Sequence, residues 1–199
     1  SQINPHFLFN SLNAGAQLAM MEDAEKTGIF VEKMADFFRY NVKKGQEDAT
    51  LGEELEAVDN YIYILNVRFA GDIHFSKDVD ESLENVRVPS MILQPIVENA
   101  VNHGIRDIEW EGKIHLTVTG DADYIRISVK DNGKGMTPEQ IEGVLSGNKE
   151  YRKEEGDSTG IGMNNVISRL ELYYEEKGLV EIRSDGLDKG TEVIVYIPV

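Results

Sequence analysis

The amino-terminal segment places a histidine among aromatic residues, in the sequence SQINPHFLFNSLN. If this segment is one helix, four polar residues share a single stripe while apolar residues cover most of the remaining surface: His6, Asn10, Asn13 and Gln17. An imidazole on such a stripe can be reached from outside and can act as a nucleophile. The alternative is a solvated histidine without chemistry, which is the commoner use of a histidine near a helix start.

A second group of polar residues lies on one side of a helix predicted over residues 89–105. These residues face away from the apolar side of the helix: Glu98, Asn99, Asn102 and His103. Amide and carboxylate oxygens are ligands that Mg²⁺ accepts, usually together with substrate phosphates and water. One asparagine plus phosphate oxygens would therefore hold the ion. A solvated helix face is the alternative reading.

Two glycine-rich segments could bind a nucleotide. In DNGKGM, Asp131 ends a predicted strand and can accept a hydrogen bond from an exocyclic amine such as adenine N6, while Gly133 and Gly135 permit close approaches. In STGIGMNN, Gly160 and Gly162 lie at the start of a predicted helix, whose free N–H groups can meet phosphate oxygens. This second segment matches neither a Walker A loop nor a dinucleotide-binding turn. Ordinary turns would explain either segment alone.

The segment between the two glycine motifs is long, charged and interrupted by glycines, which is typical of a surface loop or a lid. It carries the basic cluster nearest to the expected phosphates: Lys149, Arg152 and Lys153. We expect at least one of these cations to contact the nucleotide.

Composition excludes several functions. The 199 residues include no cysteine, which removes disulfides, thiolate metal sites and cysteine nucleophiles. A net charge of −16 argues against a nucleic-acid partner and means that ATP would need a metal ion or backbone dipoles to offset its charge. No apolar run is long enough to span a membrane. Because the chain starts inside a predicted helix, we expect it to be a fragment of a protein with upstream segments.

The first part of the chain reads as helices. Residues 1–21 form one predicted helix, and a second one ends near residue 46. A third follows TLGE, a capping box with Thr50 as N-cap and Glu53 three residues later. The first two helices are too apolar to bury their surfaces alone, so we expect a homodimer with a four-helix bundle.

After Gly71 the pattern changes to alternating strands and helices. Strands are predicted over residues 73–79, 113–120, 124–131, 180–184 and 191–199, and helices over residues 89–105, 137–146 and 161–176. Regular alternation indicates one buried and one solvated sheet face. The prediction is an α+β fold: a helical hairpin over residues 1–70, followed over residues 71–199 by a two-layer α/β sandwich, a mixed sheet with helices on one face.

In order, the motifs NPHFLFNSLN, VENAVNH, DNGKG and TGIGM closely resemble those of the LytS/YesM-type sensor histidine kinases. The resemblance covers essentially the whole chain, and the first motif is the most specific. In that family the dimerisation helices carry a phospho-accepting histidine. The catalytic domain has the Bergerat ATP-binding fold, which is shared with DNA gyrase, MutL and ATP-dependent heat-shock chaperones.

The resemblance implies roles for individual residues. His6 matches the phospho-acceptor, Asn99 the Mg²⁺ ligand and Asp131 the adenine-binding aspartate. The other expected ATP-binding residues are Asn102, His103, Gly133, Gly135, Met136, Arg152, Gly160, Ile161, Gly162, Met163 and Thr191. Asn10 is expected to orient the imidazole, and Glu98 is counted with the catalytic residues. Asn102 departs from relatives that often carry lysine, so the lid cations or Mg²⁺ must do more here.

The implied reaction is phosphoryl transfer from Mg²⁺–ATP to His6, followed by transfer to an aspartate of a response regulator. We expect this fragment to be cytoplasmic, in a protein that reaches the membrane only through segments preceding it. One rival is a non-kinase ATPase or ATP-binding switch of the gyrase, chaperone and MutL superfamily, with Glu98 as the base for water. Another is a degenerate dimer that only binds partners. The histidine helix argues against the first rival, and the intact glycine motifs argue against the second.

Overall fold

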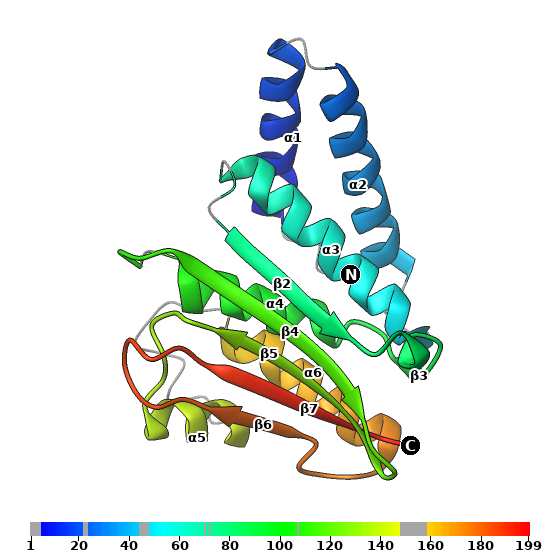
Figure 1. Ribbon diagram of the computed structural model, residues 1–199, viewed down its shortest axis with the longest axis vertical. Coiled ribbons are helices and arrows are strands. Elements are labelled where there is room, and N and C mark those ends of the chain that lie inside the picture. The colour runs from blue at the N-terminus through cyan, green and yellow to red at the C-terminus, as the bar shows by residue number, and fades with distance from the viewer. Residues whose placement is uncertain are drawn as a thin grey trace.

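The computed structural model describes residues 5–21, 24–43, 48–69, 71, 73–106, 108–147 and 159–199. Its first two helices, α1 (Pro5–Met20) and α2 (Ala24–Lys43), form an antiparallel pair that projects from the rest of the molecule (Figure 1). Helix α3 (Leu51–Arg68) crosses the base of this pair and packs on both helices and on α4 (Leu93–Asn99). The three predicted amino-terminal helices are confirmed.

The predicted capping box at the start of α3 is also confirmed. The Thr50 hydroxyl accepts the backbone N–H of Glu53 at 3.2 Å, and the Glu53 carboxylate accepts that of Thr50 at 2.8 Å. Apolar residues behind this cap build the buried side of α3, including Leu55, Val58 and Ile62. The cap therefore fixes where α3 begins, directly before its first core residue, Leu51.

Five strands form a mixed sheet in the order β2-β4-β5-β7-β6. Their bounds are β2 (Ile73–Val79), β4 (Gly112–Gly120), β5 (Tyr124–Asp131), β6 (Val180–Arg183) and β7 (Glu192–Pro198). Strand β2 pairs in parallel with β4, and the other neighbours are antiparallel. The predicted alternation is confirmed, since Ile114, Leu116 and Val118 are all buried while the residues between them are more exposed.

Helices cover one face of this sheet. Helices α4 and α6 (Thr159–Tyr174) lie behind it in Figure 1, and α5 (Pro138–Ser146) packs against α6. The other face carries polar pairs such as Arg126 and Glu192, whose side chains are 2.8 Å apart. The predicted two-layer α/β sandwich with a mixed sheet is therefore confirmed.

The prediction of one helix over residues 89–105 is wrong at its start, and the last part of this segment is π-helical rather than α-helical. Residues Arg87–Pro89 form a short strand, β3, paired antiparallel with β1 (Asp48–Thr50), so α4 begins only at Leu93. Tertiary contacts cause this delay, because a carboxylate from α3 accepts the backbone N–H groups of residues 91–93. From Ala100 to Ile105 the backbone is π-helical, in the element η2. A π-helical turn is often found at a functional site.

The second glycine motif also differs from its prediction. Helix α6 begins at Thr159 rather than at residue 161, so Gly160 lies within its first turn together with Gly162 and not ahead of the helix. The helix ends at Tyr174, two residues earlier than expected.

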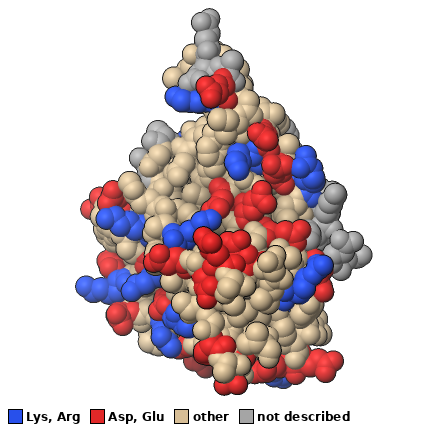
Figure 2. Space-filling view, turned by 45° about the vertical axis from the view of Figure 1, so that its right-hand side comes forward, with Lys and Arg blue, Asp and Glu red and all other residues tan. Residues whose placement is uncertain are grey.

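Acidic side chains gather in the middle of the face shown in Figure 2, with Lys and Arg mostly around them. This distribution agrees with the net charge of −16. Within the described ranges, no helix is both long enough and apolar enough to cross a membrane.

Candidate nucleotide-binding site

The centre of the candidate site is the carboxyl group of Asp131, which is only 6% exposed at the end of β5. Its Oδ1 atom accepts the backbone N–H of Gly133 at 2.8 Å and that of Thr191 at 3.2 Å. Within the described residues, the Asp131 carboxyl group accepts these two hydrogen bonds, and both go to Oδ1. The second oxygen, Oδ2, is therefore the acceptor that a ligand can use.

Three chain segments meet at this carboxyl group with no room for side chains. A Cβ atom added to Gly104 would lie 2.8 Å from Cγ of Asp131, and one added to Gly133 would lie 2.0 Å from the Gly104 carbonyl oxygen. The end of η2, the turn after β5 and the start of β7 thus converge on one carboxylate. Sequence reasoning missed Gly104, although its place directly after His103 in the VENAVNHG segment was a usable signal.

Burial raises the pKa of Asp131 from 3.8 to about 6, although the two N–H donors oppose the shift. A carboxyl group whose pKa is higher in the folded chain than in the unfolded chain stabilises the fold while it is protonated. That stability is lost as the pH rises from about 4 through about 6.

We therefore expect a pH-dependent loss of stability that disappears in the Asp131→Asn variant. Between pH 4 and pH 6.5, the free energy of unfolding of the wild type should fall relative to the variant by up to about 3 kcal/mol, the equivalent of the pKa difference. Urea unfolding of both proteins across this range measures the effect. Parallel curves for the two proteins would contradict the raised pKa of the buried Asp131 carboxyl group.

A methyl group at Gly133 should be strongly destabilising. The clash with the Gly104 carbonyl cannot relax easily, because Lys134 N–H donates to that carbonyl at 3.0 Å and Gly190 N–H donates to the Gly133 carbonyl at 3.0 Å. We expect Gly133→Ala to lower the free energy of unfolding by about 3 kcal/mol, measured by urea unfolding.

The matched control is Gly28→Ala in α2, where an added Cβ meets nothing within 4 Å. The free energy of unfolding of this variant should rise by about 1 kcal/mol, because alanine has a higher helix propensity than glycine. If the free energy of unfolding of Gly133→Ala lies within about 0.5 kcal/mol of the wild-type value, the turn after β5 can move to accommodate the methyl group.

The polar residues predicted on α4 and η2 do not share one environment. Glu98 is partly buried and accepts the Gln94 side-chain N–H at 2.8 Å, and its burial raises its pKa. Asn99 and His103 are half-buried, whereas Asn102 is exposed on the π-helical turn. The structure thus keeps Asn99 beside Glu98 and leaves Asn102 in solvent. Sequence reasoning missed Gln94, which is buried.

The other predicted glycine-motif residues lie near α4 and the β5 turn. A Cβ on Gly162 would be 3.9 Å from Pro95 of α4, and Met163 beside it is buried. Met136 is half-buried, and its backbone N–H donates to the Ser184 hydroxyl at 3.0 Å. Gly135 adopts a positive φ of 68° in the same turn. The backbone of Gly160 and Ile161 belongs to the first turn of α6.

His6 lies in the first turn of α1, and its side chain is outside the described part of the structure. Its neighbour Phe7 packs on Phe37 of α2 and Tyr61 of α3, with ring centroids 5.1 and 5.7 Å away. Phe7 thus joins α1 to α2 and α3 of its own chain, and Asn10, one turn after His6, is half-buried.

The predicted lid cations fall outside the described residues: Lys149, Arg152 and Lys153. Their expected contact with a nucleotide stays a prediction.

Two protein-family models match this chain. The model for histidine kinases matches residues 1–73. The model for histidine kinase-, DNA gyrase B- and HSP90-like ATPases matches residues 86–199, which is more than half of the chain. The chain belongs to this ATPase family. The histidine kinase match ahead of the ATPase match agrees with the order of motifs along the sequence.

Relatives in this family are sensor kinases. Sensor histidine kinase YpdA of Escherichia coli (strain K12) is 37% identical over 204 residues, covering 100% of this chain and 33% of YpdA. Sensor protein LytS of Bacillus subtilis (strain 168) is 31% identical over 199 residues, covering 100% of this chain and 32% of LytS. The chain therefore spans about a third of the length of these relatives. The predicted membership in the LytS-type sensor histidine kinases is confirmed.

A solved structure supports the ATPase-family fold. The catalytic domain of histidine kinase ThkA superposes with a TM-score of 0.54, at 22% sequence identity, over 77% of this chain and 98% of that one. At this identity the likeness concerns the fold alone.

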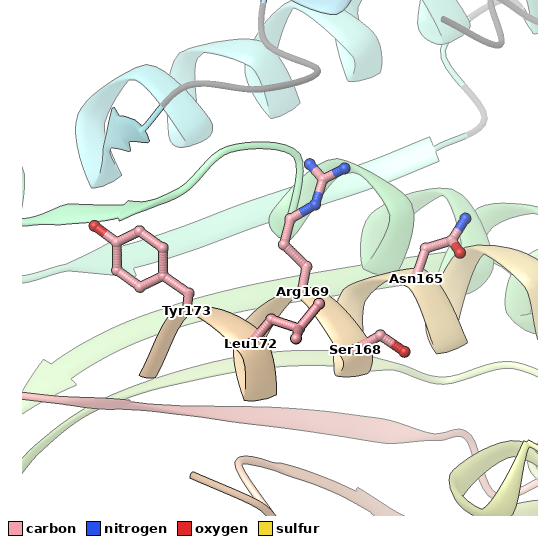
Figure 3. A pocket seen from close by; sticks show the side chains of 5 residues that line it. All are labelled: Asn165, Ser168, Arg169, Leu172 and Tyr173. Carbon is pink, nitrogen blue, oxygen red and sulfur yellow. The ribbon is translucent and has the colours of Figure 1, made fainter. Parts of the chain in front are cut away.

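An open hollow of about 590 Å³ lies on α6, away from the converging segments at Asp131. Its lining residues are drawn in Figure 3: Asn165, Ser168, Arg169, Leu172 and Tyr173. Arg169 donates to the Ser90 carbonyl, and the Tyr173 hydroxyl donates to Asp48 at 3.0 Å. These polar groups tie α6 to the β1–β3 region, so we assign the hollow no part in the family's nucleotide site.

Proposed function

We propose that this chain is the kinase core of a two-component sensor histidine kinase. In this proposal residues 1–70 dimerise and carry the phospho-accepting His6, and residues 71–199 bind ATP. The observation that carries the proposal is the buried Asp131 carboxylate, whose Oδ2 atom can accept from a ligand, in a chain whose first helix carries a histidine in its first turn. A purely structural module has no need of such a carboxylate.

Asp131 would recognise the adenine ring. Its Oδ2 atom accepts the exocyclic amine, and the absence of side chains at Gly104 and Gly133 lets the backbone close around the carboxylate. Met136, Gly135 and Thr191 border the same turn and complete the adenine side of the site. The first turn of α6, with Gly160, Ile161, Gly162 and Met163, offers N–H groups to the phosphates.

Asn99 would hold Mg²⁺ through its amide oxygen. The described residues contain no group of three His, Cys, Asp or Glu side chains that could hold a metal by themselves, so the ion would arrive with the nucleotide phosphates and keep water ligands. When bound, Mg²⁺ neutralises phosphate charge. Asn102 and His103 follow on η2, and the lid residue Arg152 would supply a cation.

His6 would attack the γ-phosphorus of ATP. A nitrogen–phosphorus bond forms, the bond from phosphorus to the ADP oxygen breaks, and the imidazole releases its other proton to solvent. A solvated imidazole is mostly uncharged at neutral pH, so this step needs little activation by a base. Asn10, one helical turn away, would orient the ring. Because the phosphoramidate transfers its phosphate readily, an aspartate of a response regulator would accept it next.

A homodimer would cover apolar side chains that the hairpin exposes. In α1 and the residue after it, the exposed fractions are 49% for Leu12, 81% for Met20 and 76% for Met21. In α2 they are 40% for Ile29 and 49% for Val31. Pairing of two such hairpins in a four-helix bundle buries these surfaces. We further infer a cytoplasmic position for this core, with membrane anchoring through parts of the protein outside this chain.

Incubation of the chain with Mg²⁺ and γ-labelled ATP tests this proposal. We expect protein-bound label that is labile to acid and stable to alkali, as a phosphohistidine is. Release of free phosphate without bound label would favour the rival ATPase, in which Glu98 activates water. The burial of Glu98 and its bond to Gln94 offer that rival one supporting observation, which this experiment decides.

A further inference from the structure

The start of α4 is capped by a buried carboxylate from another helix. Glu54 of α3 is 1% exposed and accepts the backbone N–H groups of Met91, Ile92 and Leu93 at 2.6, 2.9 and 2.9 Å. The first N–H groups of a helix lack partners within the helix and carry the positive end of its dipole, so a carboxylate is well placed there. The position of α4 thus depends on α3. Glu54 could have been noticed from its helical spacing among apolar residues, between Leu51 and Val58.

The same carboxylate contacts α2. The hydroxyl group of Tyr40 donates to Oε1 of Glu54. Burial raises the pKa of Tyr40 far above its ordinary value, and the neighbouring Glu54 carboxylate adds to the shift. Tyr40 therefore stays protonated at neutral pH and can donate this hydrogen bond. The end of α2 is tied to the cap of α4.

A second connection runs from Asn41 of α2 to Glu98 of α4, through Gln94. The side chains of Asn41 and Gln94 exchange two hydrogen bonds, of 3.2 and 3.3 Å. Gln94 also donates to Oε1 of Glu98 at 2.8 Å. The path Asn41–Gln94–Glu98 therefore ends one residue from the proposed Mg²⁺ ligand.

The same helix α2 contacts the segment that carries His6. Phe37, one turn before Tyr40 and Asn41, packs on Phe7 with ring centroids 5.1 Å apart. One helix thus contacts both the histidine segment and, through two adjacent polar residues, the cap and the polar face of α4.

We propose that Tyr40 and Asn41 are positioning residues for phosphoryl transfer, which set the placement of α4 and its Asn99 relative to the helix bearing His6. This inference rests on the proposed function for its kinetic consequence, but the structural coupling between α2 and α4 is independent of that function. Movement of α2 would then change the alignment of the phosphate with the histidine while leaving the adenine contact at Asp131 intact.

The test uses Tyr40→Phe, which removes one hydroxyl, Asn41→Leu, which removes the amide at similar size, and the double variant. The control is Tyr124→Phe, since the Tyr124 hydroxyl also donates to a glutamate, Glu176 at 3.0 Å, but at an exposed position. For each protein we measure the dissociation constant of Mg²⁺–ATP and the rate of histidine labelling at saturating ATP. The double variant should label about 10-fold more slowly with its ATP affinity within about twofold of the wild type, a loss in rate alone.

A second readout does not need kinase activity. Amide hydrogen exchange over residues 36–43 is measured with and without Mg²⁺–ADP. Nucleotide should slow exchange in the wild type and in Tyr124→Phe, and should no longer do so in the double variant. If the wild type shows this coupling but no label, the proposed function fails, while the structural coupling between α2 and α4 stands. Three results would each overturn the inference. The first is that nucleotide leaves amide exchange over residues 36–43 of the wild type unchanged. The others are a double variant that labels at the wild-type rate, or one that loses labelling rate and ATP affinity equally.

Discussion

Replacing His6 with glutamine is expected to abolish the acid-labile label completely while Mg²⁺–ATP continues to bind. Glutamine is similar in size and suits a helix, but its amide nitrogen has no free electron pair with which to attack phosphorus. The proposed nucleotide contacts, Asp131 and Asn99, belong to other elements and are untouched by the change. The acid-labile label is measured by incubation with γ-labelled ATP, followed by acid and alkali treatment. The binding of Mg²⁺–ATP is measured by equilibrium dialysis.

The same substitution at His74 serves as the control. This histidine lies on the edge strand β2, where its side chain is 55% exposed beside Glu111. His74→Gln should label at the wild-type rate. Acid-labile label that persists in His6→Gln would place the acceptor elsewhere, and loss of ATP binding in that variant would show that α1 contributes to the nucleotide site.

Asp131→Asn should weaken ATP binding about 100-fold, the equivalent of about 2.7 kcal/mol for a lost hydrogen bond to a charged acceptor in a buried place. The asparagine oxygen can still accept the N–H groups of Gly133 and Thr191. Its NH₂ group then occupies the Oδ2 position and presents a donor to the adenine amine, which is also a donor. Equilibrium dialysis at pH 7.5 measures the affinity, and the free energy of unfolding at this pH should not fall, because a buried charge has been removed.

The control is Asp123→Asn, an exposed residue in the turn between β4 and β5, at the opposite end of β5 from Asp131. Its ATP affinity should equal that of the wild type. A dissociation constant for Asp131→Asn within twofold of the wild-type value would remove Asp131 from the nucleotide site. A parallel loss of stability and affinity would instead assign it a role in folding.

The sequence by itself determined the elements and the order of the motifs. The capping box at Thr50 and the alternation in β4 and β5 depend only on residues a few positions apart, so they can be read from the chain alone. Strands β2 and β5 match their predicted bounds for this reason. Sequence motifs likewise led to the sensor histidine kinase family and singled out Asp131.

Only the tertiary structure decided how the site is held. The start of α4 was misjudged because its cap, Glu54, lies 37 residues before Met91, the first residue that it contacts. The approach of Gly104 to Asp131 and the packing of Phe7 on Tyr61 also join segments that are far apart along the chain. Periodicity and capping rules describe neighbours within about one helical turn or one strand. A buried carboxylate finds its partners through the fold, so the connection from α2 to α4 became visible only in three dimensions.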